Sequence, residues 1–213
     1  MPRPGRSAPG AVVCDRAQRA RLAGRTVGDV LVGLDNGVRV RIRPIRPADG
    51  ALLDDGLERL SRASAYQRFL SPKLALSAAE RRYLTEVDFR DHVALVAVRP
   101  EAPGELVGVG RWIRLRDEPD AAEIAFVVSD ALQRQGLGTA LAEALADAAR
   151  DRGVRRFVAT MLPDNVAARR LFARVAPAAE LRVAGTLHEL RGEISGGRAR
   201  RAGPPRRSAP APA

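Results

Sequence analysis

The stretch AEIAFVVSDALQRQGLGTAL, residues 122–141, decides the fold. It begins with an apolar run over 122–128, which is typical of a buried strand. The loop QRQGLG, residues 133–138, comes next and opens into a segment with apolar residues at helical spacing, 136–152. We therefore predict a strand, a glycine loop and a helix in immediate succession, an arrangement that suits a phosphate at the helix start.

The segments on either side continue the alternation of strand and helix patterns. A crossover helix makes the strands at 122–128 and 157–161 a parallel pair within a sheet that is otherwise mainly antiparallel. The predicted fold class is α/β (α+β), a mixed sheet with helices on both faces. Further strands are predicted at 38–43, 93–98, 106–115, 181–184 and 186–194, and helices after Asp49, after Ser77 in a capping box, and over 165–175.

The formal net charge of +11 is concentrated at the two ends. Six arginines and one aspartate lie in residues 1–26, and five arginines and no acidic residue lie in 195–213. Both ends are also rich in Pro, Gly, Ala and Ser, so we predict disordered basic tails around a nearly neutral domain, residues 27–194. Because the tails contain no aromatic residue, any nucleic-acid contact is expected to be weak, sequence-independent and sensitive to salt.

The sequence also bears on the compartment in which the protein works. Its one cysteine, Cys14, excludes an intrachain disulfide. No apolar run approaches the roughly 20 residues of a membrane helix, and the N-terminus lacks the apolar core of a secretory signal. We therefore expect a cytoplasmic protein without a membrane partner.

The loop at 133–138 has chemistry of its own. The first backbone N–H groups of a helix are unpaired and carry partial positive charge, and glycines allow a diphosphate to approach them closely. Arg134 adds a cation nearby. The same glycines also suit a tight strand-to-helix turn without a ligand, and the loop lacks the Gly-Lys-Ser/Thr ending of a Walker loop.

QRQGLG at 133–138 resembles the pyrophosphate-binding signature of the GNAT superfamily of N-acetyltransferases, and PDNVAARRLF at 163–172 resembles its second motif. The stretch 41–98 is most similar to the catalytic domain of bacterial protein lysine acetyltransferases, and the likeness covers about 38–194. It implies a splayed sheet, with acetyl-CoA as the cosubstrate, an amine such as a protein lysine as the acceptor, and no metal. It also implies cofactor contacts from Phe126, Val127, Val128, Gln133, Arg134, Gln135, Gly136, Gly138, Thr139 and Asn165.

The resemblance also assigns a general base. Glu123 lies in an apolar strand, ten residues before Gln133, where these relatives place a catalytic glutamate. A lysine amine has a pKa of ~10.4, so attack on a thioester requires its deprotonation. From the pattern alone, Glu123 also fits a solvent-facing position on an alternating strand. Many relatives carry a tyrosine that protonates the leaving thiolate, but here that position is Phe172, which leaves an unassisted thiolate or a donor such as Ser129.

Two functions of different class follow from these observations. The first is an acetyl-CoA-dependent N-acetyltransferase. The second is a CoA-binding or nucleic-acid-associated protein with basic tails and no catalysis. His92 and His188 have no cysteine or acidic cluster at ligand spacing, so we do not predict a zinc site, and we interpret His92 as structural.

Overall fold

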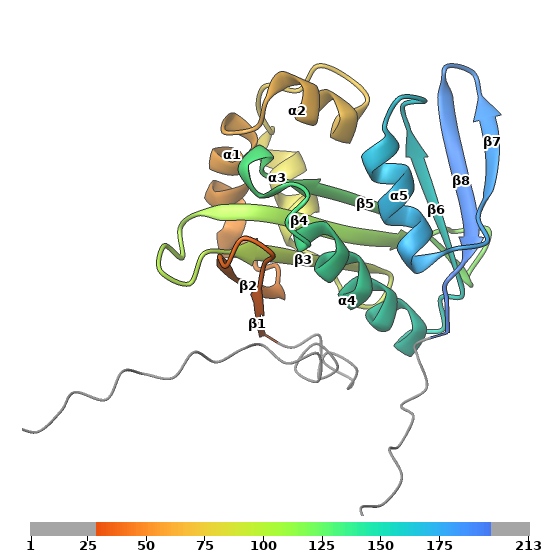
Figure 1. The fold of residues 1–213 in the computed structure, drawn as a ribbon, viewed down its shortest axis with the longest axis horizontal. Helices are drawn as coiled ribbons and strands as arrows, with labels where there is room; N and C mark the ends of the chain where they lie inside the picture. Colours follow the sequence, from red (N-terminus) through yellow and green to blue (C-terminus); the bar gives the residue numbers. More distant parts are fainter. Residues whose placement is uncertain (1–28, 197–213) are drawn as a thin grey trace, which may run out of the picture.

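The structure is a computed structural model that describes residues 29–196 (Figure 1). The predicted tail over 1–26 lies outside the described residues, as do all but the first two residues of the tail over 195–213. The described residues form one eight-stranded sheet in the order β1-β2-β3-β4-β5-β6-β8-β7. All neighbouring strands are antiparallel except β5 and β6, so the predicted mixed sheet with one parallel pair is confirmed.

The chain builds the sheet almost in sequence order. The first half contains β1 (Val30–Gly33), β2 (Arg39–Pro44), α1 (Gly50–Glu58), α2 (Arg62–Phe69), α3 (Ala78–Thr85), β3 (His92–Val98) and β4 (Leu106–Arg114). The second half contains β5 (Ala121–Val128), α4 (Leu137–Asp151), β6 (Arg156–Met161), α5 (Val166–Val175), β7 (Glu180–Ala184) and β8 (Leu187–Glu193). Short 3-10 helices precede α1 and follow β5, at Pro47–Asp49 and Asp130–Leu132.

Helices cover both faces of the sheet, as predicted, because side chains alternate along each strand. On one face, Trp112 of β4 is fully buried in a cluster with the apolar stripe of α4, including Leu141 and Leu145. On the other face, Val109 of β4 packs in a second cluster with Leu57 of α1. The two clusters hold β4 and β5 between helices, which fixes the strand that carries the candidate site.

The predicted role of Asp49 as a helix cap is wrong. Asp49 occupies the N-cap position of α1, but its side chain makes no capping hydrogen bond. Both carboxylate oxygens instead accept from the guanidinium of Arg43, at 2.7 and 2.8 Å. Oδ2 also accepts from the Arg46 N–H at 2.8 Å, so Asp49 closes the 3-10 turn before α1 and does not cap α1 itself. The capping box of α3 is present as predicted, since Ser77 and Glu80 exchange both hydrogen bonds.

Two elements have no counterpart among the predictions. The strand β1 is only four residues long and pairs with β2 at one edge of the sheet. The helix α2 has the polar sequence RASAYQRF and buries only Ala65, so it shows no apolar stripe. The one sequence signal for α2 is Ser61, whose side chain caps it by accepting from the Ser64 N–H.

Candidate active site

The sheet opens between its two parallel strands. The pairing of β5 with β6 ends at Glu123 opposite Val158, although β5 continues to Val128 and β6 to Met161. The predicted parting of these strands is therefore confirmed, beginning after Val158. Beyond Glu123, one edge of β5 has no strand beside it.

Backbone alternation decides which groups of β5 line this gap. The Ser129 N–H donates to Val107 O at 2.9 Å, so Ser129 points toward β4, and so does Val127, two residues earlier. The backbone groups of Ile124, Phe126 and Val128 then point into the gap. Phe126 thus presents its N–H and C=O, and Val128 its N–H, where a ligand amide could pair. The Val128 C=O already accepts from the Gln133 amide at 3.2 Å, and the predicted contact from Val127 is turned away from the gap.

The glycine loop ends at the start of α4. Gly136 occupies the N-cap position with φ of 86°, a left-handed conformation that favours glycine, and Arg134 also has a positive φ, 60°. A glycine at the N-cap has no side chain to satisfy the free N–H groups of the first turn, which includes Gly138 and Thr139. These donors, with the exposed Arg134, make the helix start suitable for an anion.

Gly138 has a packing role as well. A Cβ at this position would lie 3.3 Å from Leu171 of α5 and 3.9 Å from Val128 of β5. The missing side chain therefore lets α5 and the end of β5 approach the first turn of α4. This close approach brings the open end of the gap to the helix start.

A hydrogen-bonded cluster joins α2 to the same loop. The carboxylate of Asp130 accepts from the Ser61 N–H at 2.8 Å, from the Ser61 hydroxyl at 3.0 Å and from the Ser64 hydroxyl at 2.6 Å. The Gln133 amide donates to Ser64 Oγ, to Val128 O and to Asp130 Oδ1. Sequence reasoning missed this link, which ties the N-terminus of α2 to the end of β5 and to the loop.

Glu123 lies where the gap opens. Its side chain is exposed and projects on the same face of the sheet as α1, α2 and α3, opposite the face that packs on α4. Arg111 of β4 projects on this face too, because it pairs in register with Ala125. Arg68 of α2 is near enough that the charge of Glu123 favours its protonated form. The exposed carboxylate is thus accessible to an incoming amine.

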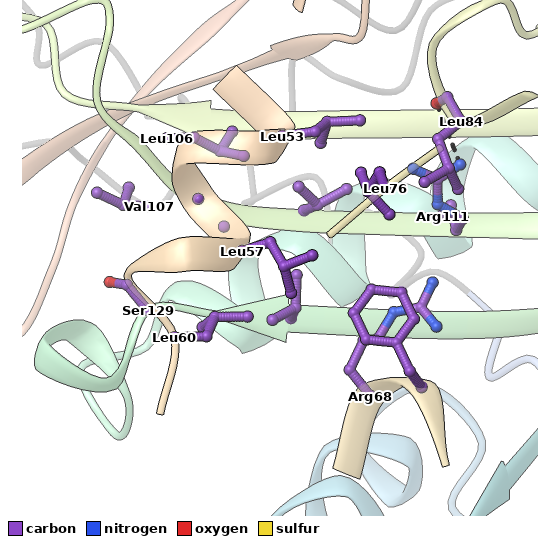
Figure 2. A pocket seen from close by; sticks show the side chains of 15 residues that line it. Leu53, Leu57, Leu60, Arg68, Leu76, Leu84, Leu106, Val107, Arg111 and Ser129 are labelled. Atoms are coloured by element: carbon purple, nitrogen blue, oxygen red, sulfur yellow. Dashed lines mark hydrogen bonds between the residues drawn. The ribbon is translucent and has the colours of Figure 1, made fainter. Parts of the chain in front are cut away.

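A pocket occupies this face (Figure 2). Arg111 in its wall is a diagonal neighbour of Glu123 on the β4–β5 ladder. Its cavity volume is about 60 Å³, and the space around the cavity is open to solvent. Apolar side chains make most of the wall, and two guanidiniums, from Arg68 and Arg111, complete it. Ser129 contributes a hydroxyl at the end of β5. The apolar wall and the two cations suit one part of an acceptor, such as a small group or the end of a side chain.

His92 fixes the buried guanidinium. Arg111 is 4% exposed, and its Nη1 lies 3.1 Å from His92 Nε2 and donates to Leu84 O at 3.2 Å. Burial, followed by the charge of Arg111, lowers the pKa of His92 from 6.5 to about 4. The ring is therefore neutral at pH 7 and can accept from Arg111, which supports its interpretation as a structural residue.

This depressed pKa predicts that acid destabilises the fold through His92. The unfolded chain binds a proton at His92 below about pH 6.5 and the folded chain does not, so stability falls as the pH drops from 6.5 toward 4. After allowance for the partial exposure of the ring, the contribution is about 1–2 kcal/mol. Urea unfolding at pH 7 and pH 4.5 measures it. The fall in unfolding free energy between pH 7 and pH 4.5 should be smaller in His92→Gln and unchanged in His188→Gln. An equal fall in the wild-type protein and in both variants would refute the assignment.

The sequence matches the Acetyltransferase (GNAT) family over residues 61–176. The chain is 34% identical over 160 residues to the acetyltransferase Pat of Mycolicibacterium smegmatis, covering 75% of this chain and 47% of that protein. It is 34% identical over 158 residues to an acetyltransferase of Pseudomonas aeruginosa, covering 73% and 84%. The crystal structure of the GNAT domain of S. lividans PAT superposes with a TM-score of 0.70 at 32% identity, covering 78% and 97%. The chain belongs to the GNAT family.

In this GNAT domain, most of the predicted cofactor residues follow one path. The path runs from Phe126 and Val128 in the gap, through the loop at 133–136, to Gly138 and Thr139 in the first turn of α4. Asn165 caps α5 through Oδ1, which accepts from the Ala168 N–H at 2.9 Å. Within residues 29–196 its amide group makes no hydrogen bond, so that group is the one left to meet a ligand. The cofactor contacts themselves stay predictions.

Phe172 lies in the core of the GNAT domain. It is 2% exposed, and its ring has no proton to give a leaving thiolate. Ser129 lines the pocket at the end of β5, but its position does not assign it that role. Over residues 29–196 no three His, Cys, Asp or Glu side chains group as metal ligands, and no helix has the length and hydrophobicity to cross a membrane.

Proposed function

We propose that this GNAT domain transfers the acetyl group of acetyl-CoA to a primary amine, with a protein lysine as the acceptor to test first. The observation that carries the proposal is the gap between β5 and β6. It begins beside Glu123 and ends at the first turn of α4, so a base, free backbone groups and an anion-binding helix start lie along one path.

The residues present fit acetyl-CoA. Backbone groups of Phe126 and Val128 would pair with the amides of its pantetheine arm, as a neighbouring strand would. The free N–H groups at the start of α4, with Arg134, would hold the pyrophosphate. The Asn165 amide would donate to the pantetheine or to the backbone next to it. Acetyl-CoA, when bound, supplies an activated thioester.

Glu123 takes a proton from the acceptor ammonium, directly or through a water molecule. The amine nitrogen then attacks the thioester carbon, and the Val128 N–H, which points into the gap, stabilises the developing oxyanion. This attack forms the C–N bond, and collapse of the intermediate breaks the C–S bond. The proton that the nitrogen still has to lose passes to the departing thiolate or to water. Coenzyme A departs as a thiolate. Because a thiol has a pKa of about 8.5, the thiolate can leave without a general acid, and the buried Phe172 has no proton to supply.

A thermal shift series tests the cofactor before any acceptor is known. A ligand at about 100 times its Kd should add roughly 2.7 kcal/mol, several degrees for a domain of this size. We expect shifts with acetyl-CoA and with free CoA and none with ATP. No shift with either CoA species would overturn the proposal.

An acetylation assay with lysine peptides then tests transfer. Incorporation of acetyl into the peptide supports the proposal, and release of CoA without incorporation contradicts it. Binding of CoA without transfer to any amine would favour the alternative of a CoA-binding protein without catalysis.

For the compartment, the single cysteine supports a cytoplasmic location.

A further inference from the structure

Two cations line the pocket, and within the described part of the chain neither is in an ion pair, although the charge of Glu123 acts on Arg68 from a longer distance. Among residues 29–196, neither Arg68 nor Arg111 forms an ion pair with a carboxylate, although both line the pocket. Buried charges in proteins are ordinarily paired, because an unpaired charge loses its hydration without compensation. The pair therefore calls for an explanation that the fold does not supply.

Arg111 is the stronger anomaly. It emerges from the middle of β4 into the pocket wall and is 96% buried, since its exposed fraction is 4%. Its partners are the neutral His92 ring and a backbone carbonyl, and its buried Nε makes no hydrogen bond. Burial, and then the charge of Arg68, lowers its pKa to about 9, so it is still a cation at neutral pH.

Arg68 reaches the same end of the pocket from α2 (Figure 2). Its guanidinium lies over the ring of Phe69, 5.2 Å from the ring centre, a contact that holds a cation without neutralising it. Burial lowers the pKa of Arg68, and the charge of Glu123 opposes that shift. Two guanidiniums that repel each other at one apolar site are arranged as a receptor for an anion.

The position of the two guanidiniums relative to Glu123 follows from the strand register. Glu123 faces Ile113 across the β4–β5 ladder and Arg111 faces Ala125, so Glu123 and Arg111 are diagonal neighbours on one face. Diagonal residues in an antiparallel pair are separated by about 7–8 Å. An acceptor amine at Glu123 would therefore place a group several bonds away against the two guanidiniums.

We propose that Arg68 and Arg111 bind a carboxylate carried by the acceptor, so that the enzyme selects amines with an acidic group a few bonds from the nitrogen. The proposal rests on the proposed function, in which Glu123 receives the amine. Two sources offer this chemistry, a small amino acid with its amine at one end, or an acidic side chain beside a lysine in a protein. Both put a carboxylate within reach of a planar guanidinium fork.

Matched acceptors test the selection. The small-molecule pairs are 4-aminobutanoate and 6-aminohexanoate against their carboxamides, and the peptide pair is a lysine flanked by glutamate against the same lysine flanked by glutamine. We expect at least a tenfold higher kcat/KM for the acid in one of the pairs, expressed mainly in KM. The pair that shows the preference identifies the source. Equal kcat/KM for acid and amide in every pair would overturn the proposal.

Three variants locate the effect. Arg68→Gln and Arg111→Met should each reduce the acid preference toward unity, while the Kd for acetyl-CoA stays within about twofold. Methionine keeps much of the length and apolar packing of the arginine stem, and the Tm of each variant reports whether it folds. Arg182→Gln, an exposed arginine on β7, should keep the preference. If Arg68→Gln and Arg111→Met both fold and retain the acid preference, the assignment of the two arginines is wrong.

A binding measurement separates this proposal from the proposed function. With CoA present, 6-aminohexanoate should raise the Tm of the wild-type protein more than its carboxamide does, and Arg111→Met should abolish the difference. That pattern without acetyl transfer to any amine would retain the carboxylate site and reject the transferase. Acetyl transfer without any difference between acid and amide would retain the transferase and reject the carboxylate site.

Discussion

Replacing Glu123 by glutamine is expected to lower kcat by about 10²- to 10⁴-fold, the range that a positioned general base contributes. The Glu123→Gln side chain keeps the size of glutamate but cannot accept the proton of the acceptor ammonium. Because the carboxylate is exposed at the opening of the β5–β6 gap and is not part of the core, the fold should tolerate the change. The Kd for acetyl-CoA should stay within about twofold, since none of the predicted cofactor contacts uses the Glu123 side chain.

The pH dependence makes this test specific for a base. A lysine amine has a pKa of ~10.4, so raising the pH supplies free amine without help from the protein. The deficit of Glu123→Gln should therefore shrink between pH 7 and pH 9.5 in steady-state assays. Glu143→Gln, on the exposed side of α4, is a matched control and should behave as wild type. A Glu123→Gln enzyme with unchanged kcat at pH 7 would show that the carboxylate is a solvent-facing residue.

The sequence was sufficient to predict the strand, loop and helix that carry the cofactor path. The periodicity over 136–152 is strong because the leucines and alanines at helical spacing are among the nine residues that α4 buries, and the glycines mark a turn that other residues adopt poorly. The parting of β5 from β6 came from the family resemblance, since no local pattern reports where a ladder stops. Local signals therefore predict elements, and the resemblance predicts how two of them separate.

The acceptor side of the site was not predictable in the same way. Arg68 lies on α2, which has no apolar stripe, and Arg111 follows a run of alternating glycines in β4, so neither position shows a functional pattern. Their meeting depends on α2 folding back over β5, an arrangement held by Asp130 and the serines of α2. Such contacts between distant segments leave no trace in the spacing of residues along the chain.

The buried ion pair between Arg43 and Asp49 illustrates a local signal that was misread. An aspartate before an apolar helix is a common cap, and Asp49 does sit at that position. The competing partner is six residues away on β2, where Arg43 projects inward at the end of the strand. The bidentate guanidinium and the Arg46 N–H together engage both oxygens, which leaves the first turn of α1 uncapped.

Removing this carboxylate is expected to cost about 3–5 kcal/mol of unfolding free energy, the loss found when one member of a buried ion pair is deleted. In Asp49→Ala the side chain of Arg43, in a residue only 9% exposed, would keep its charge with the Pro44 carbonyl as its remaining partner. The Arg46 N–H would also lose its acceptor, which now lies at 2.8 Å. For a domain of this size the Tm should fall by roughly 6–20 °C in a calorimetric scan.

Two comparisons distinguish the loss of the pair from a loss of bulk. Asp29 pairs with Arg41 at 3.4 Å in an exposed position, so Asp29→Ala should change stability by less than about 1 kcal/mol. The double variant Arg43→Met with Asp49→Leu removes both charges and should recover most of the stability, because an apolar pair of similar volume needs no compensation.

The stabilisation by this ion pair also depends on pH. Burial alone would raise the pKa of Asp49, but the hydrogen bonds from Arg43 and Arg46 lower it. The contribution of the pair is therefore present at neutral pH and is lost as acid protonates the carboxylate. A single Asp49→Ala variant as stable as Asp29→Ala would mean that solvent reaches Arg43 and that the pair does not stabilise the junction of β2 and α1.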